Sequence, residues 1–119
     1  MKTIQVEELE QLSADEIQVI DLRPEEEYKR GSFPGAVNLP MEEFDSRYEE
    51  VLEKEKPIYF ICHTGERSKD YIETATKAGY NAFNVEGGYR AYLRLSLSRF
   101  LEEDTKESKE EKTKEIERS

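Results

Sequence analysis

Residues 58–71, IYFICHTGERSKDY, contain the only cysteine and the only histidine of the chain, side by side at Cys62 and His63. The stretch opens with four consecutive apolar residues, a pattern typical of a short strand that is buried on both faces. A polar loop follows, and a helix is predicted to begin at about Arg67 or Ser68. The stretch therefore predicts a strand, a short loop and a helix, with a thiol at the point where the strand ends.

Strand-like and helix-like segments alternate along the rest of the chain. Apolar runs predict further strands over residues 17–22, 36–39 and 82–85. Helical periodicity and helix-end signals predict a helix that starts at Pro24, one over residues 41–54, one that is closed by Gly79 and one over residues 89–101. This alternation is typical of an α/β domain with a mainly parallel sheet.

The size and charge of the chain limit its class. Its 119 residues fit one domain, and 39% of them are charged against 35% hydrophobic, so we expect a small core. The net charge of −10 argues against nucleic acid or an anionic membrane surface as a partner. The N-terminus lacks the apolar region of a signal peptide, and no apolar run approaches the length of a membrane span.

A single cysteine indicates a reducing environment, because it cannot form an internal disulfide. We therefore expect a cytoplasmic protein. One cysteine and one histidine also fall short of the ligand set of a usual zinc site, so no metal site and no cofactor are expected.

The composition changes after Leu101. Residues 102–119 hold eight acidic and five basic residues, and Ile116 is their only apolar member. Such a segment cannot bury enough surface to offset the entropy of ordering it. The sequence thus predicts a folded domain over residues 1–101 and a charged, disordered tail over residues 102–119. A tail that docks onto a partner protein is the alternative.

The position of Cys62 has a chemical consequence. In parallel α/β sheets, functional groups lie at the carboxyl ends of strands, where loops lead into helix N-termini. Backbone N–H groups of such a loop and the positive helix end stabilise an anion, and the thiolate is the nucleophilic form of cysteine. Gly65 permits a positive φ where the loop curls around the sulfur, and Arg67 adds positive charge. These features favour a reactive thiolate over the alternative, a buried structural cysteine.

Three separated motifs resemble those of one known family: VIDLRPEEEYKRGSFPGAVNLP at residues 19–40, CHTGERS at residues 62–68 and NVEGGYRAYL at residues 84–93. Their order and spacing are similar to those of the single-domain rhodaneses, a family of sulfurtransferases. The resemblance covers nearly the whole chain, from about Thr3 to Leu101. It implies one rhodanese-like domain with a mainly parallel five-stranded sheet that is flanked by helices on both faces.

The resemblance also implies a mechanism. The Cys62 thiolate takes a sulfane sulfur from thiosulfate, a polysulfide or another persulfide, and a thiol, cyanide or a sulfur-accepting protein then removes it. The implied persulfide-binding loop, whose backbone amides cradle the sulfur, consists of His63, Thr64, Gly65, Glu66 and Arg67. The His63 side chain either takes part in the chemistry or is an exposed loop residue.

Residues at a neighbouring strand end are implied to support this loop. Asp21 and Arg23 match the D-x-R pair of the family, and with Ser68 they are expected to hold the loop through polar contacts. The alternative for Asp21 and Arg23 is a plain surface ion pair, which contributes little to stability.

The chain departs from the family pattern at a few positions. Ser32 and Phe33 stand where the family often has histidine and an aliphatic residue, and Tyr92 stands where tryptophan is common. We interpret these differences as packing variation. Within the loop, Glu66 beside Arg67 makes the charge less positive than in loops suited to thiosulfate, which weakens the case for thiosulfate as the physiological donor.

Two other kinds of function are open. A phosphatase on the same fold has five residues between its loop cysteine and arginine, whereas four residues separate Cys62 from Arg67. The smaller ring suits a single sulfur atom better than a phosphate group. Some rhodanese-like domains are interaction modules that have lost the cysteine, and the presence of Cys62 argues against that role. A carrier that passes its persulfide to one partner protein remains open.

Overall fold

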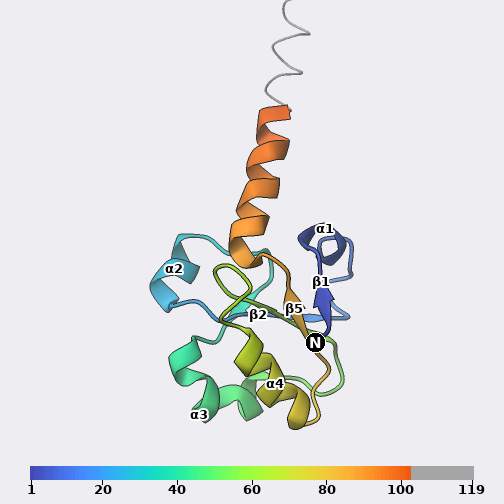
Figure 1. The fold of residues 1–119 in the computed structure, drawn as a ribbon, viewed down its shortest axis with the longest axis vertical. Helices are drawn as coiled ribbons and strands as arrows, with labels where there is room; N and C mark the ends of the chain where they lie inside the picture. Colours follow the sequence, from blue (N-terminus) through green and yellow to red (C-terminus); the bar gives the residue numbers. More distant parts are fainter. Residues whose placement is uncertain (103–119) are drawn as a thin grey trace, which may run out of the picture.

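Strands and helices alternate through residues 1–102, the part of the chain that the computed structural model describes (Figure 1). The strands are β1 (Thr3–Ile4), β2 (Gln18–Asp21), β3 (Val37–Asn38), β4 (Ile58–Ile61) and β5 (Ala82–Val85). The helices are α1 (Val6–Leu9), α2 (Glu25–Arg30), α3 (Met41–Val51), α4 (Lys69–Lys77) and a last helix over residues 88–102.

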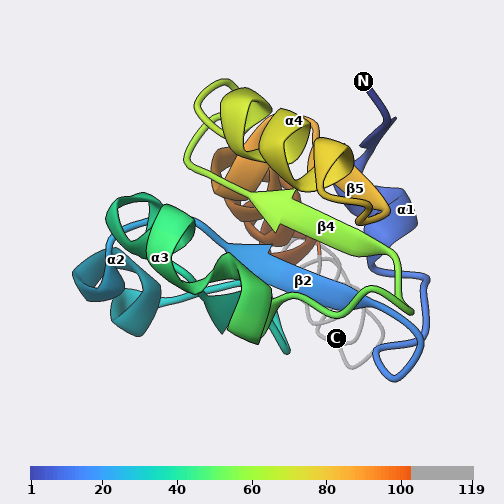
Figure 2. The same ribbon diagram turned by 90° about the horizontal axis from the view of Figure 1, so that it is seen from below.

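The strands form one parallel sheet in the order β1-β5-β4-β2-β3. β4 lies at the centre between β5 and β2, and all its residues are buried, which explains its uniformly apolar sequence. Because the strands run in one direction, their carboxyl ends meet at one edge of the sheet (Figure 2). At that edge Asp21, the last residue of β2, pairs with Ile61, the last residue of β4. The segments that follow the two strands therefore start side by side.

Helices cover both faces of the sheet, and each face has its own core. Phe60 of β4 packs in one core with Phe44, under α3 and α4. Its neighbour Tyr59 points to the opposite face and packs in the other core with Leu9 of α1 and the first turns of helix 88–102. This alternation along β4 is the normal geometry of a strand. The predicted parallel sheet of five strands with helices on both faces is confirmed.

Several predicted elements agree closely with the structure. The strand predicted over residues 82–85 is β5, and the apolar run at the start of residues 58–71 is β4. The predicted helix that is closed by Gly79 is α4, and Gly79 has a φ of +96°, the left-handed conformation that commonly ends a helix.

Other predicted details differ. The helix predicted over residues 41–54 ends at Val51, because the backbone of Leu52 is extended (φ −80°, ψ 138°) and its side chain is buried in the core. Pro24 precedes α2 instead of being its first residue. β1 and α1 have no predicted counterpart, because a strand of two residues and a helix of four are too short to show a periodicity.

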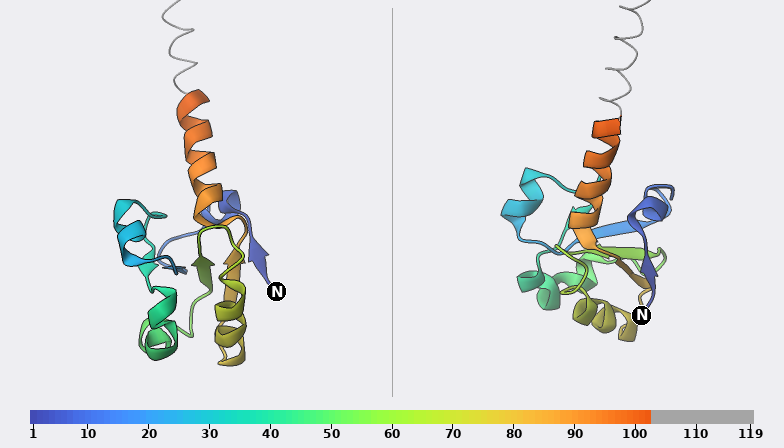
Figure 3. Two further views of the ribbon diagram at one scale, coloured as in Figure 1. Left: turned by 60° about the vertical axis from the view of Figure 1, so that its left-hand side comes forward. Right: turned by 45° about the horizontal axis from the view of Figure 1, so that its top comes forward.

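The last helix rises from the carboxyl edge of the sheet and extends beyond the other elements (Figures 1 and 3). It agrees with the helix predicted over residues 89–101. The predicted tail lies, apart from Glu102, outside the described residues. No helix within residues 1–102 combines the length and the apolar character that are needed to cross a membrane.

Candidate functional site

The loop after β4 curls around the sulfur of Cys62. The backbone N–H of Gly65 donates a hydrogen bond to Cys62 Sγ at a distance of 3.0 Å. This curl requires a φ of +89° at Gly65, which confirms the predicted positive φ. Cys62 itself is buried, with no exposed surface. The sulfur therefore lies inside the loop and not on its outer surface.

Helix 88–102 holds the same loop from the other side. The N–H of Tyr89 donates to the carbonyl of Cys62 at 2.9 Å, and the N–H of Arg90 donates to the carbonyl of His63 at 3.1 Å. Amides in the first turn of a helix have no partner within the helix, so they are available for these bonds. With two loop carbonyls directed at the helix, the loop is oriented so that Gly65 turns its N–H toward the sulfur.

This close approach depends on glycine. Gly88 has a φ of +58°, and a Cβ atom at this position would lie 2.3 Å from the Cys62 carbonyl oxygen. A Cβ atom at Gly65 would lie 3.0 Å from the backbone nitrogen of Gly87. At Gly65, Gly87 and Gly88, therefore, two backbone segments meet without side chains between them.

A buried polar network joins the loop to β5. The Asn84 Nδ2 donates to the Gly65 carbonyl at 3.0 Å, and the Ser68 hydroxyl donates to Asn84 Oδ1 at 2.6 Å. Because the single Ser68 proton points to Asn84, the Ser68 oxygen faces Cys62 Sγ, 3.4 Å away, as an acceptor for the thiol proton. Asn84 is absent from the predicted site, although one polar residue in the apolar run of β5 is the signal that marks it.

Asp21 and Arg23 form a buried pair. Arg23 Nη2 lies 2.7 Å from Asp21 Oδ2 and also donates to the Gly31 carbonyl at 2.7 Å. The Arg23 guanidinium lies 3.7 Å from the centre of the Tyr89 ring. The alternative of a surface ion pair is wrong, because both side chains are at least 95% buried. The pair reaches the loop through Tyr89, whose backbone N–H binds Cys62, and its role in supporting the loop stays a prediction.

The other loop side chains point to solvent. His63, Thr64, Glu66 and Arg67 are exposed. Glu66 forms an ion pair with Lys69 at 3.0 Å, and this hydrogen bond raises the pKa of the Lys69 ammonium. The structure thus brings Cys62, Gly65 and Ser68 together and leaves the charged loop side chains at the surface.

A cavity of about 700 Å³ opens beside the loop. His63 and Arg67 line it, as do Tyr71 of α4 and the first turns of α2 and α3. Those two turns contribute five acidic residues: Glu25, Glu26, Glu27, Glu42 and Glu43.

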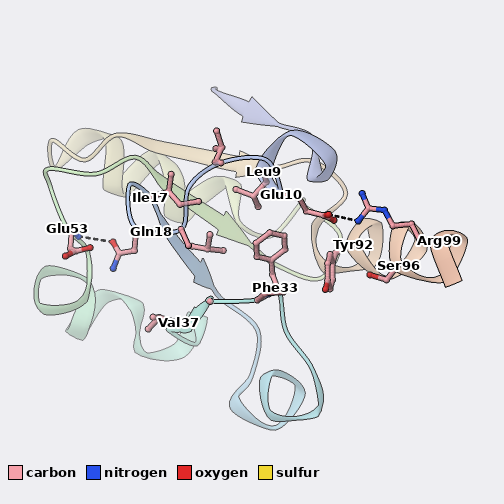
Figure 4. Close-up of a pocket in the computed structure, with 15 residues that line it drawn as sticks. Leu9, Glu10, Ile17, Gln18, Phe33, Val37, Glu53, Tyr92, Ser96 and Arg99 are labelled. Carbon is pink, nitrogen blue, oxygen red and sulfur yellow. Dashed lines mark hydrogen bonds and ion pairs between the residues drawn. The ribbon is translucent and has the colours of Figure 1, made fainter. Parts of the chain in front are cut away.

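A second cavity of about 500 Å³ lies between α1, β2 and helix 88–102 (Figure 4). It is lined mainly by apolar side chains, with the ion pair between Arg99 and Glu10 at its edge. No residue of the Cys62 loop lines it. We therefore assign the candidate site to the first cavity and the loop beside it.

Comparison with known proteins decides the family, because residues 5–95 match the rhodanese-like domain. The chain belongs to the rhodanese-like domain family. It is 37% identical over 84 residues to a Bacillus subtilis protein named "Putative sulfurtransferase YtwF", covering 70% of this chain and 81% of that protein. It is 31% identical over 106 residues to the human thiosulfate:glutathione sulfurtransferase, covering 76% and 92% of the two chains.

Solved structures show the same rhodanese fold. A rhodanese-like domain protein from Staphylococcus aureus superposes with a TM-score of 0.71 at 33% sequence identity. The match covers 77% of this chain and 91% of that chain. This chain and that protein therefore share the rhodanese fold.

Replacing Gly88 with Ala should displace the Cys62 loop. The new Cβ atom would meet the Cys62 carbonyl oxygen, so we expect a loss of at least about 3 kcal/mol in the free energy of unfolding. Gly35→Ala is the matched control, because Gly35 also has a positive φ but a Cβ atom added there would have no neighbour within 4 Å. It should cost about 1–2 kcal/mol. Equal losses in the free energy of unfolding for the two variants, measured by urea denaturation, would contradict the importance of the close contact between Gly88 and the Cys62 carbonyl.

Replacing Asn84 with Ala should loosen the loop around the sulfur, because the Gly65 carbonyl and the Ser68 hydroxyl lose their buried partner. We expect native-state alkylation of Cys62 by iodoacetamide to become about 10-fold faster, which corresponds to about 1.4 kcal/mol of local stability. Asn81→Ala, a change at an exposed position before β5, is the control and should leave the rate unchanged. An Asn84→Ala protein that is alkylated at the wild-type rate would show that Asn84 does not hold the loop closed around the sulfur.

Proposed function

We propose that the protein is a sulfurtransferase that carries a sulfane sulfur as a persulfide on Cys62. The observation that carries this proposal is the loop that directs the Gly65 N–H to Cys62 Sγ at 3.0 Å, at the carboxyl end of the central strand. A backbone N–H placed in this way stabilises a sulfur anion without a counter-ion. The sulfurtransferase names of the two relatives support the same chemistry.

The transfer proceeds in two balanced steps. The Cys62 thiolate attacks the outer sulfur of the donor, a new S–S bond forms, and the bond within the donor breaks with its electron pair. With thiosulfate the leaving group is sulfite, and Cys62 becomes a persulfide anion. A nucleophilic acceptor, a thiol or cyanide, then attacks the terminal sulfur, and the Cys62 thiolate leaves. No cofactor is needed, because one sulfur atom moves without net oxidation or reduction of the protein.

The geometry of the loop supports a sulfur atom as the transferred group. Four residues separate Cys62 from Arg67, and the ring they form already closes on Sγ through the Gly65 amide. A tetrahedral phosphate needs a wider ring of donors, so a phosphatase is the less favoured function. Because Cys62 is buried, the proposal requires a local opening of the loop for each transfer.

The charge of the cavity bears on the identity of the donor. Within residues 1–102, Glu25 and Glu43 form ion pairs with Lys29 and Arg47, whereas Glu26, Glu27 and Glu42 form none. The Arg23 charge is already paired with Asp21, which leaves Arg67 as the cation that faces these glutamates. We propose that the donor is a polysulfide or a persulfide of low negative charge, and that the dianion thiosulfate is a poor donor. A reducing compartment such as the cytoplasm suits the free thiol.

Cys62→Ser should abolish sulfur transfer and leave the fold intact. A serine hydroxyl is nearly isosteric but stays protonated near neutral pH, and the chain has no second cysteine to carry the sulfur. The measurement is thiocyanate formation from cyanide, with thiosulfate and with a polysulfide as donors. Mass spectrometry of the wild-type protein after incubation with polysulfide should show an added mass of about 32 Da, one sulfur atom. A Cys62→Ser protein that turns over either donor would refute the mechanism.

Neutralising the glutamates of the cavity should improve the use of thiosulfate. The triple variant Glu26→Gln, Glu27→Gln and Glu42→Gln removes three negative charges near an incoming dianion, so we expect kcat/KM for thiosulfate to rise about 10-fold at low salt. The gain should shrink as ionic strength increases. Glu7→Gln, Glu8→Gln and Glu16→Gln together form the control, because these exposed residues are outside the lining of the cavity. Equal effects of the two triple variants would show that net charge alone matters.

A further inference from the structure

The second cavity, between α1, β2 and helix 88–102, has apolar walls that are open to solvent. Phe33 and Tyr92, both in its lining, meet edge to face with ring centres 5.2 Å apart (Figure 4). Leu12 and Val37, also in the lining, are 40% and 48% exposed. The volume of about 500 Å³ falls within the roughly 300–1,000 Å³ of small-molecule sites. Because an apolar ligand releases the water held against such walls, the cavity favours a ligand with an apolar body.

Polar groups lie at the two ends of this cavity (Figure 4). At one end the Gln18 side chain donates to the Val51 carbonyl at 2.7 Å and accepts from the Glu53 N–H at 2.9 Å. Each polar atom of Gln18 therefore has a partner within the protein. At the other end the Arg99 guanidinium donates to Glu10 Oε2 at 2.5 Å. That bond uses only one of the two carboxylate oxygens.

The second oxygen of this carboxylate is unsatisfied. Glu10 Oε1 is buried and has no hydrogen-bond partner among the described residues. Such an atom is unusual, because buried polar groups in proteins are normally paired and leaving one unpaired is unfavourable. The Glu10 side chain as a whole is 21% exposed, so a small rotation of the carboxylate turns this oxygen toward the cavity. A ligand with an N–H or O–H group at this end would supply the missing donor.

The charges of the lining favour a cationic donor over an anionic ligand. Among the described residues that line the cavity, Arg99 is the one cation, and Glu10 already balances its charge. A ligand carboxylate would lie beside Glu10 and be repelled by it, whereas an ammonium group would be attracted. The face of the Tyr92 ring, in the same lining, also attracts cations.

We propose that the second cavity is a binding site for a small apolar amine. The ammonium group of the ligand donates a hydrogen bond to Glu10 Oε1, and its apolar body lies against Phe33, Tyr92 and Val37. No residue of the Cys62 loop lines this cavity, so the ligand binds without touching the sulfur. The site is therefore independent of the sulfur transfer proposed above.

Titration of the full-length protein with phenylbutylamine, followed by its amide NMR signals, tests the proposal. We expect a dissociation constant on the order of 100 µM. The largest shifts should occur at lining residues such as Ile17, Val37 and Ser96. Phenylbutyrate, a similar apolar body that ends in a carboxylate, should bind at least about 10-fold more weakly. An amine that does not bind, that shifts the Cys62 loop most, or that binds no better than phenylbutyrate would overturn the proposal.

Two pairs of variants test where the amine binds. Glu10→Gln keeps the shape of the side chain but removes its charge, and should weaken binding about 10-fold. Glu8→Gln, at an exposed position outside the lining, should leave the affinity unchanged. Ser96→Trp places a large ring in the cavity and should abolish binding, whereas Ser98→Trp, at an exposed position of the same helix outside the lining, should not. Equal affinities within either pair would overturn the assignment of the ligand to this cavity.

Discussion

Two backbone hydrogen bonds determine the geometry of the site: those from the first-turn amides of helix 88–102, at Tyr89 and Arg90, to the carbonyls of Cys62 and His63. They connect segments that are more than twenty residues apart in the sequence. The two bonds fix the orientation of the peptide groups that join Cys62 to His63 and His63 to Thr64. The next amide along the chain, that of Gly65, donates to the sulfur.

The surrounding residues follow from this constraint. Gly88 has no side chain because the two backbones approach within a distance that a Cβ atom would not allow. Asn84 and Ser68 fill the remaining space beneath the loop with polar groups that are all hydrogen-bonded, as buried polar groups require. Arg23 stacks on the ring of Tyr89, one of the two residues whose amides bind the loop.

Local patterns in the sequence predict much of this arrangement. The apolar run of β4, the helix end at Gly79 and the positive φ of Gly65 are properties of neighbouring residues, so they can be read from short stretches. The roles of Asn84 and Gly88 cannot, because each depends on contact with a loop from a distant part of the chain. The end of α3 at Val51 likewise depends on tertiary contacts. Burial of Leu52 in the core overrides a helical pattern that continues past this residue in the sequence.

The burial of Cys62 also affects how long the protein keeps its thiol in the reduced form. A thiolate that is open to solvent reacts with peroxides and proceeds to sulfinic and sulfonic acids, from which a thiol is hardly recovered. Proteins with a neighbouring cysteine avoid this irreversible oxidation by forming a disulfide, but this chain has a single thiol. In the proposed transfer, a sulfur that is exposed only during brief openings of the loop would give slower turnover but a longer chemical lifetime.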